Sequence, residues 1–392
     1  RGPGGSRGCP AGAPPQRRGH WGARCATGPA AFRDRTAHCV EEESSRCLAM
    51  HPSGFGLRAL CAALLGAWPA ASGYAPPTKY LLVSDAVNGN IAYAKLTSPG
   101  VAGQMTPLIT KGLVHPQGIA VDQKRQLLLV ADSEPKKVFS YGLIVAGDGT
   151  LKVDQQTPLL EDVEARWVAV DGVGNVFASD ETQNQVLKVS AKQVQDGDTK
   201  ATVIYSGTDE EKVSAPGGIA ADNFFVYWTN KVNTAEAGAV ARGLASPMNE
   251  SSGVANSGGQ NSALQVLSSK SPKAYGVCVA TDNIFYTDNA NNVYAVKKSG
   301  GQVATITGDL QSPRGCAWDG DSTVYVADRS QGAVYSFDGP VMNLAQMKAT
   351  VTKVVDYSDA FGVAVFSSAL GRGLLLTRGA LLLAGAAGLA AA

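Results

Sequence analysis

Short apolar runs separated by polar turns recur along residues 79 to 366. Most of these runs are four to seven residues long, are rich in β-branched or aromatic side chains, and are bounded by Gly, Asn, Asp or Pro. Such runs are typical of β-strands, whereas an amphipathic helix repeats its apolar residues at a longer, 3.6-residue period. The pattern therefore predicts an all-β fold for this part of the chain.

Two of the runs recur as motifs. The first motif is an apolar run that usually opens with Gly, in six copies: GIAVD (118–122), WVAVD (167–171), GIAAD (218–222), GVCVA (276–280), GCAWD (315–319) and GVAVF (362–366). The second motif closes with an acid or an amide, also in six copies: YLLVSD (80–85), LLLVAD (127–132), NVFASD (175–180), VYWTN (226–230), IFYTD (284–288) and VYVAD (324–328). A third run follows each second motif, and often a fourth. Four antiparallel strands in a unit of about 47 residues predict one propeller blade.

The order of the motifs at the two ends predicts how the propeller closes. The repeats begin with a second motif at Tyr80 and end with a first motif after Phe361. One blade should therefore take its inner strand from residues 361–366 and its other three strands from residues 79–110. Such a blade closes the ring and removes open sheet edges. We predict a six-bladed β-propeller closed by the C-terminal strand.

Four stretches resemble two kinds of known repeat. HPQGIAVD, followed by LLLVADSEPKKVFSY, and SPRGCAWD, followed by VYVADRSQGAVYSF, are similar to NHL repeats. GGIAAD with FFVYWTN, and YGVCVATDNIFYTD, are similar to the YWTD repeats of lipoprotein-receptor propellers. The resemblance covers residues 79 to 366 and implies a six-bladed propeller. It does not name a partner, because such blades occur in binding proteins and in enzymes.

The segments around the propeller differ from it in composition. Residues 1–49 show no helical or strand period, and we expect a disordered or non-native leader. Residues 50–73 combine Arg58, an apolar stretch and small residues near Gly73, which is typical of a signal peptide; a short buried helix is the alternative. The propeller is assigned to residues 74–367. Residues 368–392 form an apolar tail that is either a membrane anchor or a frayed end.

Composition restricts the class of partner. Residues 74–367 contain 18 Lys and 5 Arg against 29 Asp and Glu, a net charge of −6 without a basic stripe. This argues against nucleic acid and leaves proteins, glycans or small molecules as ligands. Asn249 begins an Asn-Glu-Ser triplet in a loop rich in Ser, Gly and Asn, and it is a candidate glycosylation site. We expect a protein that is secreted or held on the extracellular face of a membrane.

Catalytic and metal-binding motifs are scarce. The predicted propeller has one His, His115, and two Cys, and no GxSxG motif. The acids that close the second motif should lie a blade-width apart, so we expect them to cap turns rather than to form a metal ring. We interpret Cys278 and Cys316, expected on opposite faces of neighbouring inner strands, as small buried residues rather than as a disulfide. We assign no catalytic residue, no metal and no cofactor.

Residues just before the first motif should surround the mouth of the central channel. Arg, Tyr, Phe and Trp at this place are residue types that often dominate the energetics of an interface. The candidate ligand-binding residues are Gln117, Arg166, Trp167, Tyr275, Arg314 and Phe361. For Trp167 and Phe361 the alternative is packing into the channel wall. The sequence favours a non-catalytic binding module that uses this face. A metal-dependent propeller hydrolase of the gluconolactonase type is the alternative, and it requires carboxylates and amides that converge on the axis.

Overall fold

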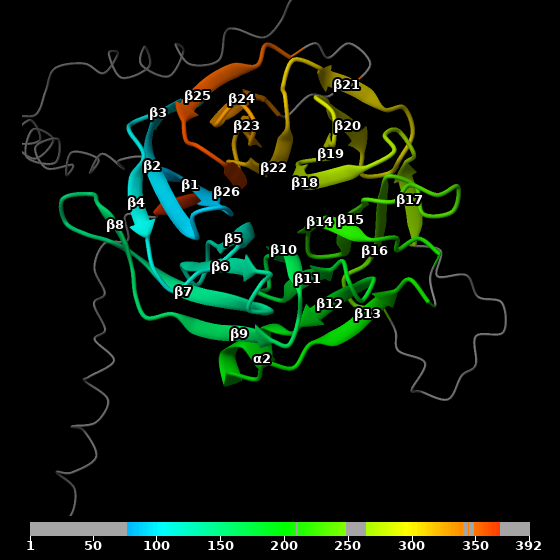
Figure 1. Cartoon of the computed structure of the whole chain (residues 1–392), viewed down its shortest axis with the longest axis horizontal. Helices are drawn as coiled ribbons and strands as arrows, with labels where there is room; N and C mark the ends of the chain where they lie inside the picture. The colour runs from blue at the N-terminus through cyan, green and yellow to red at the C-terminus, as the bar shows by residue number, and fades with distance from the viewer. Residues whose placement is uncertain (1–76, 209–210, 248–263, 340–343, 345–348, 369–392) are drawn as a thin grey trace, which may run out of the picture. The chain divides into compact units, whose positions relative to one another are not determined.

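The computed structural model describes residues 77–208, 211–247, 264–339, 344 and 349–368. Within them, six antiparallel sheets of four or five strands surround a central axis (Figure 1). The inner strands of successive sheets contact one another around the whole ring. The predicted all-β, six-bladed propeller is confirmed.

Blades 2 to 6 are built from consecutive segments. Blade 2 has β5 (Pro116–Asp122), β6 (Leu127–Asp132), β7 (Lys137–Val145), β8 (Leu151–Val153) and β9 (Thr157–Glu161). Blade 3 has β10 (Ala165–Val170), β11 (Val176–Asp180), β12 (Gln185–Val189) and β13 (Thr202–Ser206). Blade 4 has β14 (Pro216–Ala221), β15 (Phe225–Asn230), β16 (Val240–Leu244) and β17 (Gln265–Ser268). Blade 5 has β18 (Ala274–Ala280), β19 (Asn283–Asp288), β20 (Val293–Lys297) and β21 (Ala304–Thr307). Blade 6 has β22 (Pro313–Trp318), β23 (Thr323–Asp328), β24 (Ala333–Asp338) and β25 (Thr352–Asp356). The short helix α2 (Ala191–Asp196) lies between β12 and β13.

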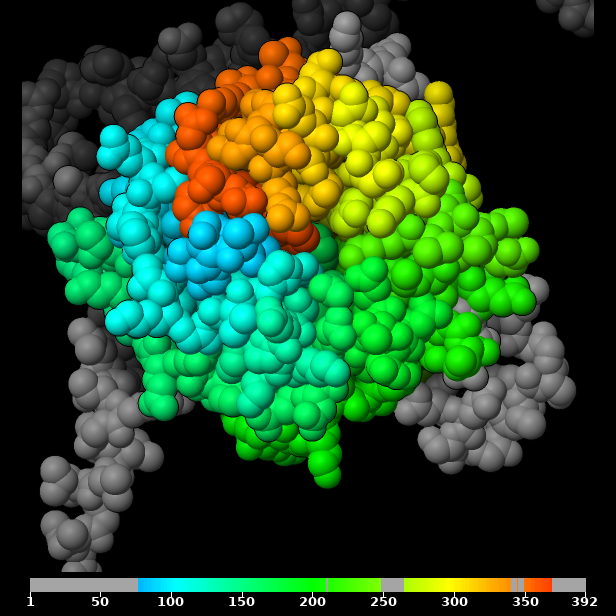
Figure 2. Space-filling view, viewed as in Figure 1, coloured from blue at the N-terminus to red at the C-terminus, as the bar shows by residue number. Residues whose placement is uncertain are grey.

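Blade 1 joins the two ends of the ring. Its strands are β26 (Ala360–Ser368), β1 (Thr78–Asp85), β2 (Asn90–Ser98), β3 (Val101–Ala102) and β4 (Thr106–Ile109). Inner strand β26 pairs antiparallel with β1, with Tyr80 opposite Phe366 and Leu82 opposite Ala364. In the space-filling view the blue residues of β1 and the red residues of the last strand lie side by side (Figure 2). The predicted closure by the C-terminal strand is confirmed.

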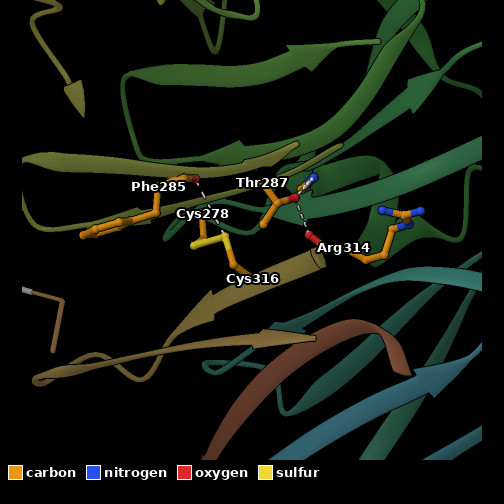
Figure 3. Close-up of a disulfide and its surroundings, with 6 residues drawn as sticks. Cys278, Phe285, Thr287, Arg314 and Cys316 are labelled. Carbon is orange, nitrogen blue, oxygen red and sulfur yellow. Dashed lines mark hydrogen bonds between the residues drawn. A yellow bond between two sulfur atoms is a disulfide. The ribbon is translucent and has the colours of Figure 1, made fainter. Parts of the chain in front are cut away.

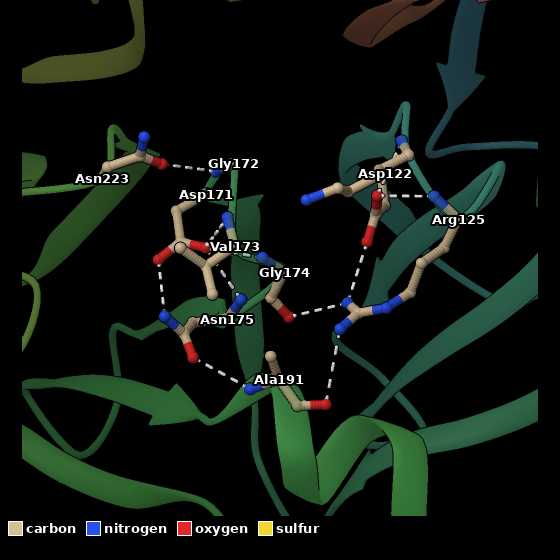
Figure 4. A network of polar contacts seen from close by, with 10 residues as sticks. Asp122, Arg125, Asp171, Gly172, Val173, Gly174, Asn175, Ala191 and Asn223 are labelled. Atoms are coloured by element: carbon tan, nitrogen blue, oxygen red, sulfur yellow. Dashed lines mark hydrogen bonds and ion pairs between the residues drawn. The ribbon is translucent and has the colours of Figure 1, made fainter.

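The turns at the far end of the inner strands link neighbouring blades through polar contacts (Figure 4). Asp122 of blade 2 accepts a hydrogen bond from Arg125 Nη1 at 3.0 Å, and the same nitrogen donates to the Gly174 carbonyl of blade 3 at 2.9 Å. The backbone N–H of Gly172 donates to Asn223 Oδ1 of blade 4 at 3.0 Å. These contacts hold the blades together at the end opposite the predicted mouth.

The acids and amide of the second motif accept hydrogen bonds from backbone N–H groups, as predicted. Asp85 caps the following turn by accepting from Asn88 at 2.9 Å. Asp132 instead accepts from His115 at 2.7 Å, so it holds the loop that leads into the inner strand of its own blade. One or both of these arrangements recur at Asp180, Asn230, Asp288 and Asp328. The prediction of a turn cap is therefore incomplete, because Asp132, Asn230 and Asp328 accept hydrogen bonds from the loop that leads into the inner strand of their own blade.

The interpretation of Cys278 and Cys316 as unbonded residues is wrong. Their sulfur atoms form a disulfide between β18 and β22, with a Cα–Cα distance of 5.6 Å (Figure 3). Both residues are buried, as expected. Neighbouring blades face each other with opposite sheet faces, so side chains on opposite faces of successive inner strands point toward one another. The expected position of the two cysteines on opposite faces of their strands is therefore the arrangement that brings their sulfur atoms together.

Several predictions from the sequence lie outside the described residues. They are the leader 1–49, the signal peptide 50–73, Asn249, and the tail from residue 369. Strand β26 reaches Ser368, the first residue assigned to that tail. Among the helices that the structure describes, none is long and apolar enough to span a membrane.

Candidate functional site at the channel mouth

The residues that precede the first motif lie at the beginning of the inner strands, where these strands approach each other most closely. A Cβ atom on Gly218 would lie 2.3 Å from the carbonyl oxygen of Tyr275, and one on Gly276 would lie 2.2 Å from that of Arg314. No side chain fits such a gap. The glycine of the first motif therefore allows successive inner strands to pack backbone against backbone, and brings the preceding residues together at the mouth.

Hydroxyl groups fix these mouth residues from the neighbouring blade. At four of the six blade boundaries, a Ser or Thr of the second strand donates to the carbonyl of the mouth residue in the next blade. The pairs are Ser84 with Gln117 at 2.6 Å, Ser179 with Gly217 at 2.5 Å, Thr287 with Arg314 at 2.7 Å, and Thr229 with Tyr275. Ala131 and Ala327 occupy the corresponding positions at the other two boundaries. The mouth is thus a preorganised backbone ring that presents a side chain from every blade except blade 4, whose mouth residue is Gly217.

Tyr275 lies within a group of cations. The guanidinium carbon of Arg314 is 4.2 Å from the Tyr275 ring centroid, and the Nζ atoms of Lys231 and Lys273 are 5.4 Å and 5.6 Å from it. Arg314 belongs to blade 6, Lys231 to blade 4, and Lys273 to the loop entering blade 5. The aromatic face attracts each of them. Arg314 is half-buried, and this burial lowers the pKa of its guanidinium because it disfavours the charged form.

Two of the mouth cations are neutralised by carboxylates. Arg166 Nη2 lies 2.7 Å from Glu164 Oε1, and its Nε lies 3.1 Å from Glu181 Oε2. Lys231 Nζ lies 2.5 Å from the same oxygen of Glu181. Burial lowers the pKa of Lys231, Arg166 and Lys273 lower it further, and Glu181 opposes them. On the blade 3 side of the mouth, the two positive and the two negative side chains therefore compensate one another.

Trp167 and Phe361 form part of the channel wall. Trp167 stands where five of the six first motifs have Gly, and its ring lies 5.3 Å from that of Phe361. Only 5% of Trp167 and 6% of Phe361 is exposed. The contact joins blade 3 to blade 1. These two residues thus support the mouth from inside and offer little of their own surface to a ligand.

Gln117 is the mouth residue of blade 2. Its side chain is buried, with 7% exposed, and its Oε1 has no hydrogen-bond donor within the described part of the chain. This carbonyl oxygen could accept a hydrogen bond from an N–H or O–H group that reached the mouth.

Two pockets open beside the ring of mouth residues, and each is lined by one of the predicted arginines. A pocket of about 580 Å³ between blades 6 and 1 is lined by Ser312, Arg314, Arg329, Ser330, Ser358 and Asp359, among others. A second pocket, of about 370 Å³, is lined by His115, Ser133, Glu134, Lys136, Glu164 and Arg166. Arg166 and Arg314 thus each border a hollow of the surface, and whether a ligand binds there stays a prediction.

Some residues at the mouth were missed from the sequence. Glu181, Lys231 and Arg329 follow directly after the acid or amide of a second motif. Since the turn after the second strand lies at the same end as the start of the inner strand, this position contributes to the mouth. The second motif could have identified them. In the described ranges, no group of three or more His, Cys, Asp or Glu side chains is arranged to hold a metal ion.

Comparison with known proteins supports the fold. No protein-family model matches the sequence, and no curated protein matches it. A chain of the nidogen/laminin complex is similar in structure, with a TM-score of 0.57 and 15% identity over 73% of this chain and 98% of that chain. Virginiamycin B lyase from Staphylococcus aureus has a TM-score of 0.43 and 10% identity over 70% and 83% of the two chains. A streptogramin B lyase has a TM-score of 0.40 and 13% identity over 74% and 92%. At 15% identity the likeness to the nidogen/laminin chain shows the fold alone, and the six sheets described above make this chain a six-bladed β-propeller.

Proposed function

We propose that the protein is a non-catalytic binding module that holds a protein partner at the channel mouth. The observation that carries the proposal is the position of Arg166 and Arg314, each of which lines a pocket beside the preorganised ring. Tyr275, a partly exposed residue with three cations near its ring, belongs to the same mouth. Arg and Tyr in desolvated pockets are the residues on which interface energies often depend. Trp167 and Phe361 stiffen the wall behind them.

A protein is a better ligand for this face than a small molecule. The two pockets, Gln117 and the Tyr275 cluster are spread over several blades, so one ligand must be broad to reach them together. A chain of similar fold is part of the nidogen/laminin complex, an assembly of proteins. Both facts favour a protein surface over a compact substrate.

We further propose that the protein acts outside the cell or on the extracellular face of a membrane. The disulfide between Cys278 and Cys316 suits an oxidising compartment, as do the signal-like residues 50–73 and the acceptor triplet at Asn249. Expression of the whole chain in a secreting cell line tests this. The protein should appear in the medium or at the cell surface, and a glycosidase that removes Asn-linked glycans should decrease its mass unless Asn249 has been changed to Gln.

Comparative capture tests the binding function. The immobilised wild-type protein, the double variant Arg166→Ala with Arg314→Ala, and the control Lys124→Gln are exposed to the same extracellular fluid. Lys124 is exposed in the turn between β5 and β6, at the opposite end of the strands. A protein captured by the wild type and by the control, but lost with the double variant, supports the function. Equal capture by all three would reject the mouth as the binding face.

The same preparation distinguishes this function from that of a metal-dependent hydrolase. Elemental analysis after dialysis should find no stoichiometric divalent ion. A retained ion would turn the assignment toward the hydrolase.

A further inference from the structure

The cations on the two sides of the mouth differ in whether they form ion pairs with carboxylates. On the blade 3 side, Arg166 and Lys231 are paired with Glu164 and Glu181. On the other side, neither Arg314 nor Lys273 has a carboxylate within ion-pair distance among the residues that the structure describes. The guanidinium of Arg314 donates a hydrogen bond to the carbonyl of its neighbour Pro313 at 2.9 Å. Its remaining N–H groups are available to a ligand.

The surroundings of Arg314 increase the attraction for an anion. Its guanidinium is partly desolvated and lies 4.2 Å from the Tyr275 ring, and the Nζ of Lys273 lies 5.6 Å from the same ring. Arg329 is the like charge that lowers the pKa of Arg314 further, and a bound anion would relieve this repulsion. A charge-assisted hydrogen bond in such a place is stronger than one on an open surface.

The adjoining pocket has the polarity that an anionic group requires. It contains Arg314 and Arg329 together with the hydroxyls of Ser312, Ser330 and Ser358. Its one acid, Asp359, lies 3.5 Å from the Nε of Arg329 and is occupied by that pair. The pocket at Arg166 contrasts with this, because Glu164 is paired with Arg166 and Glu134, for which no ion pair is found in the described residues, lines the pocket as well.

We propose that Arg314 and Lys273 form a carboxylate-binding subsite that receives an acidic side chain of the protein partner. The inference rests on the proposed function. It specifies that the partner's group bound between blades 5, 6 and 1 is a carboxylate. The planar fork of Arg314 matches the two oxygens of a carboxylate. Lys273 supplies a second charge from the neighbouring loop.

A peptide-binding measurement tests the subsite with the full chain. The probes are a fluorescein-labelled Gly-Ser peptide that contains three Glu residues and its counterpart with three Gln residues, and binding is read by fluorescence anisotropy at low salt. The Glu peptide should bind at least about tenfold more tightly than the Gln peptide. Arg314→Gln and Lys273→Gln should each remove most of this preference. Arg314→Lys, which keeps the charge but not the fork, should retain part of it.

Two matched controls separate the subsite from general electrostatic attraction. Lys124→Gln removes one positive charge from the opposite end of the propeller, and Lys152→Gln removes one from the exposed outer strand β8 of blade 2. Neither should alter the preference for Glu. Equal binding of the two peptides, or an equal loss in Lys124→Gln and Arg314→Gln, would overturn the inference. Displacement of the Glu peptide by inorganic phosphate at equal concentration would overturn the specificity for carboxylate.

The outcome can be distinguished from that of the capture experiment. If the double variant loses its partner while the Glu and Gln peptides bind alike, the mouth is the binding face and the carboxylate subsite is wrong. If the Glu preference depends on Arg314 but capture is unchanged, the subsite exists and the proposed protein-binding function is wrong. Lys273 is exposed, so its variant remains informative if a change at Arg314 prevents folding.

Discussion

The guanidinium of Arg314 lies 4.2 Å from the ring centroid of Tyr275, across the boundary between blades 5 and 6. The contact depends on the first-motif glycines, because Gly276 lets the backbone of blade 6 approach that of blade 5. Thr287 then fixes the carbonyl of Arg314 at 2.7 Å (Figure 3). The side chain with which we expect a partner to interact is therefore held by two blades.

Changing the aromatic face should alter binding without unfolding the protein. Tyr275→Phe keeps the ring and should leave the affinity for the captured partner nearly unchanged. Tyr275→Ala removes the stacking surface of Arg314 and should weaken binding by about 1 kcal/mol, or roughly fivefold in Kd. Calorimetric titration of each variant measures this. An equal loss in both variants would place the effect on the hydroxyl instead.

Loss of the disulfide should destabilise the ring. The bond closes a loop with a sequence separation of 38 residues between neighbouring inner strands. Cys278→Ser together with Cys316→Ser should lower the free energy of unfolding by about 3–4 kcal/mol. Denaturant unfolding of the double variant provides the measurement, with reduced wild type as the matched control. A double variant as stable as the oxidised wild type would contradict the expectation.

Ser84 should matter more than an ordinary surface serine. Its hydroxyl donates to the Gln117 carbonyl at 2.6 Å and accepts from the Gly362 N–H at 2.8 Å, so it links three strands at the closing blade. Ser84→Ala leaves both buried groups without this partner and should cost about 1–3 kcal/mol of unfolding free energy. Ser140→Ala, on the outer part of blade 2, should change it by less than about 0.5 kcal/mol. Similar values for the two variants would refute the bridging role.

An ion pair strengthens the boundary between blades 6 and 1, where Ala327 replaces the bridging hydroxyl. Lys79 Nζ lies 2.9 Å from Asp319 Oδ2 and also contacts Asp321. Burial alone would raise the pKa of Asp319, but hydrogen bonds from the Thr323 backbone and from Lys79 lower it overall. Burial would lower the pKa of Lys79, but the two aspartates raise it.

These shifts predict a pH window for the pair. The lowered pKa of Asp319 stabilises the fold above the ordinary value of 3.8, and the stabilisation is lost as pH falls through the folded-state value. The raised pKa of Lys79 stabilises it below 10.5, and the stabilisation is lost as pH rises through the folded-state value. The stability difference between wild type and Lys79→Met should therefore be greatest near neutral pH and shrink at both extremes. A difference that does not change with pH would show that the ion pair is not its cause.

The sequence predicted the fold because strand patterns and turn residues are local and repeat in each blade. Six copies of two motifs determined both the number of blades and the closing strand. The disulfide was missed because it depends on which sheet faces meet across a blade boundary, a relation between strands far apart in the chain. Arg166 was correctly placed at the mouth, but its pairing with Glu181 could not be foreseen, since their contact depends on the registry of two strands. The burial of Trp167 likewise follows from its neighbour Phe361, which the other end of the chain supplies.

Chemical footprinting of lysines tests the central claim most directly, because it locates the partner on the unmodified protein. The rate of acetylation of Lys273, exposed beside Tyr275, is compared with that of Lys124, exposed at the opposite end of the strands. With the captured partner at saturation, the acetylation rate of Lys273 should fall by about tenfold or more, as expected for a residue enclosed in an interface, and that of Lys124 should not change. Protection of Lys124 with Lys273 still fully reactive would contradict binding at the channel mouth.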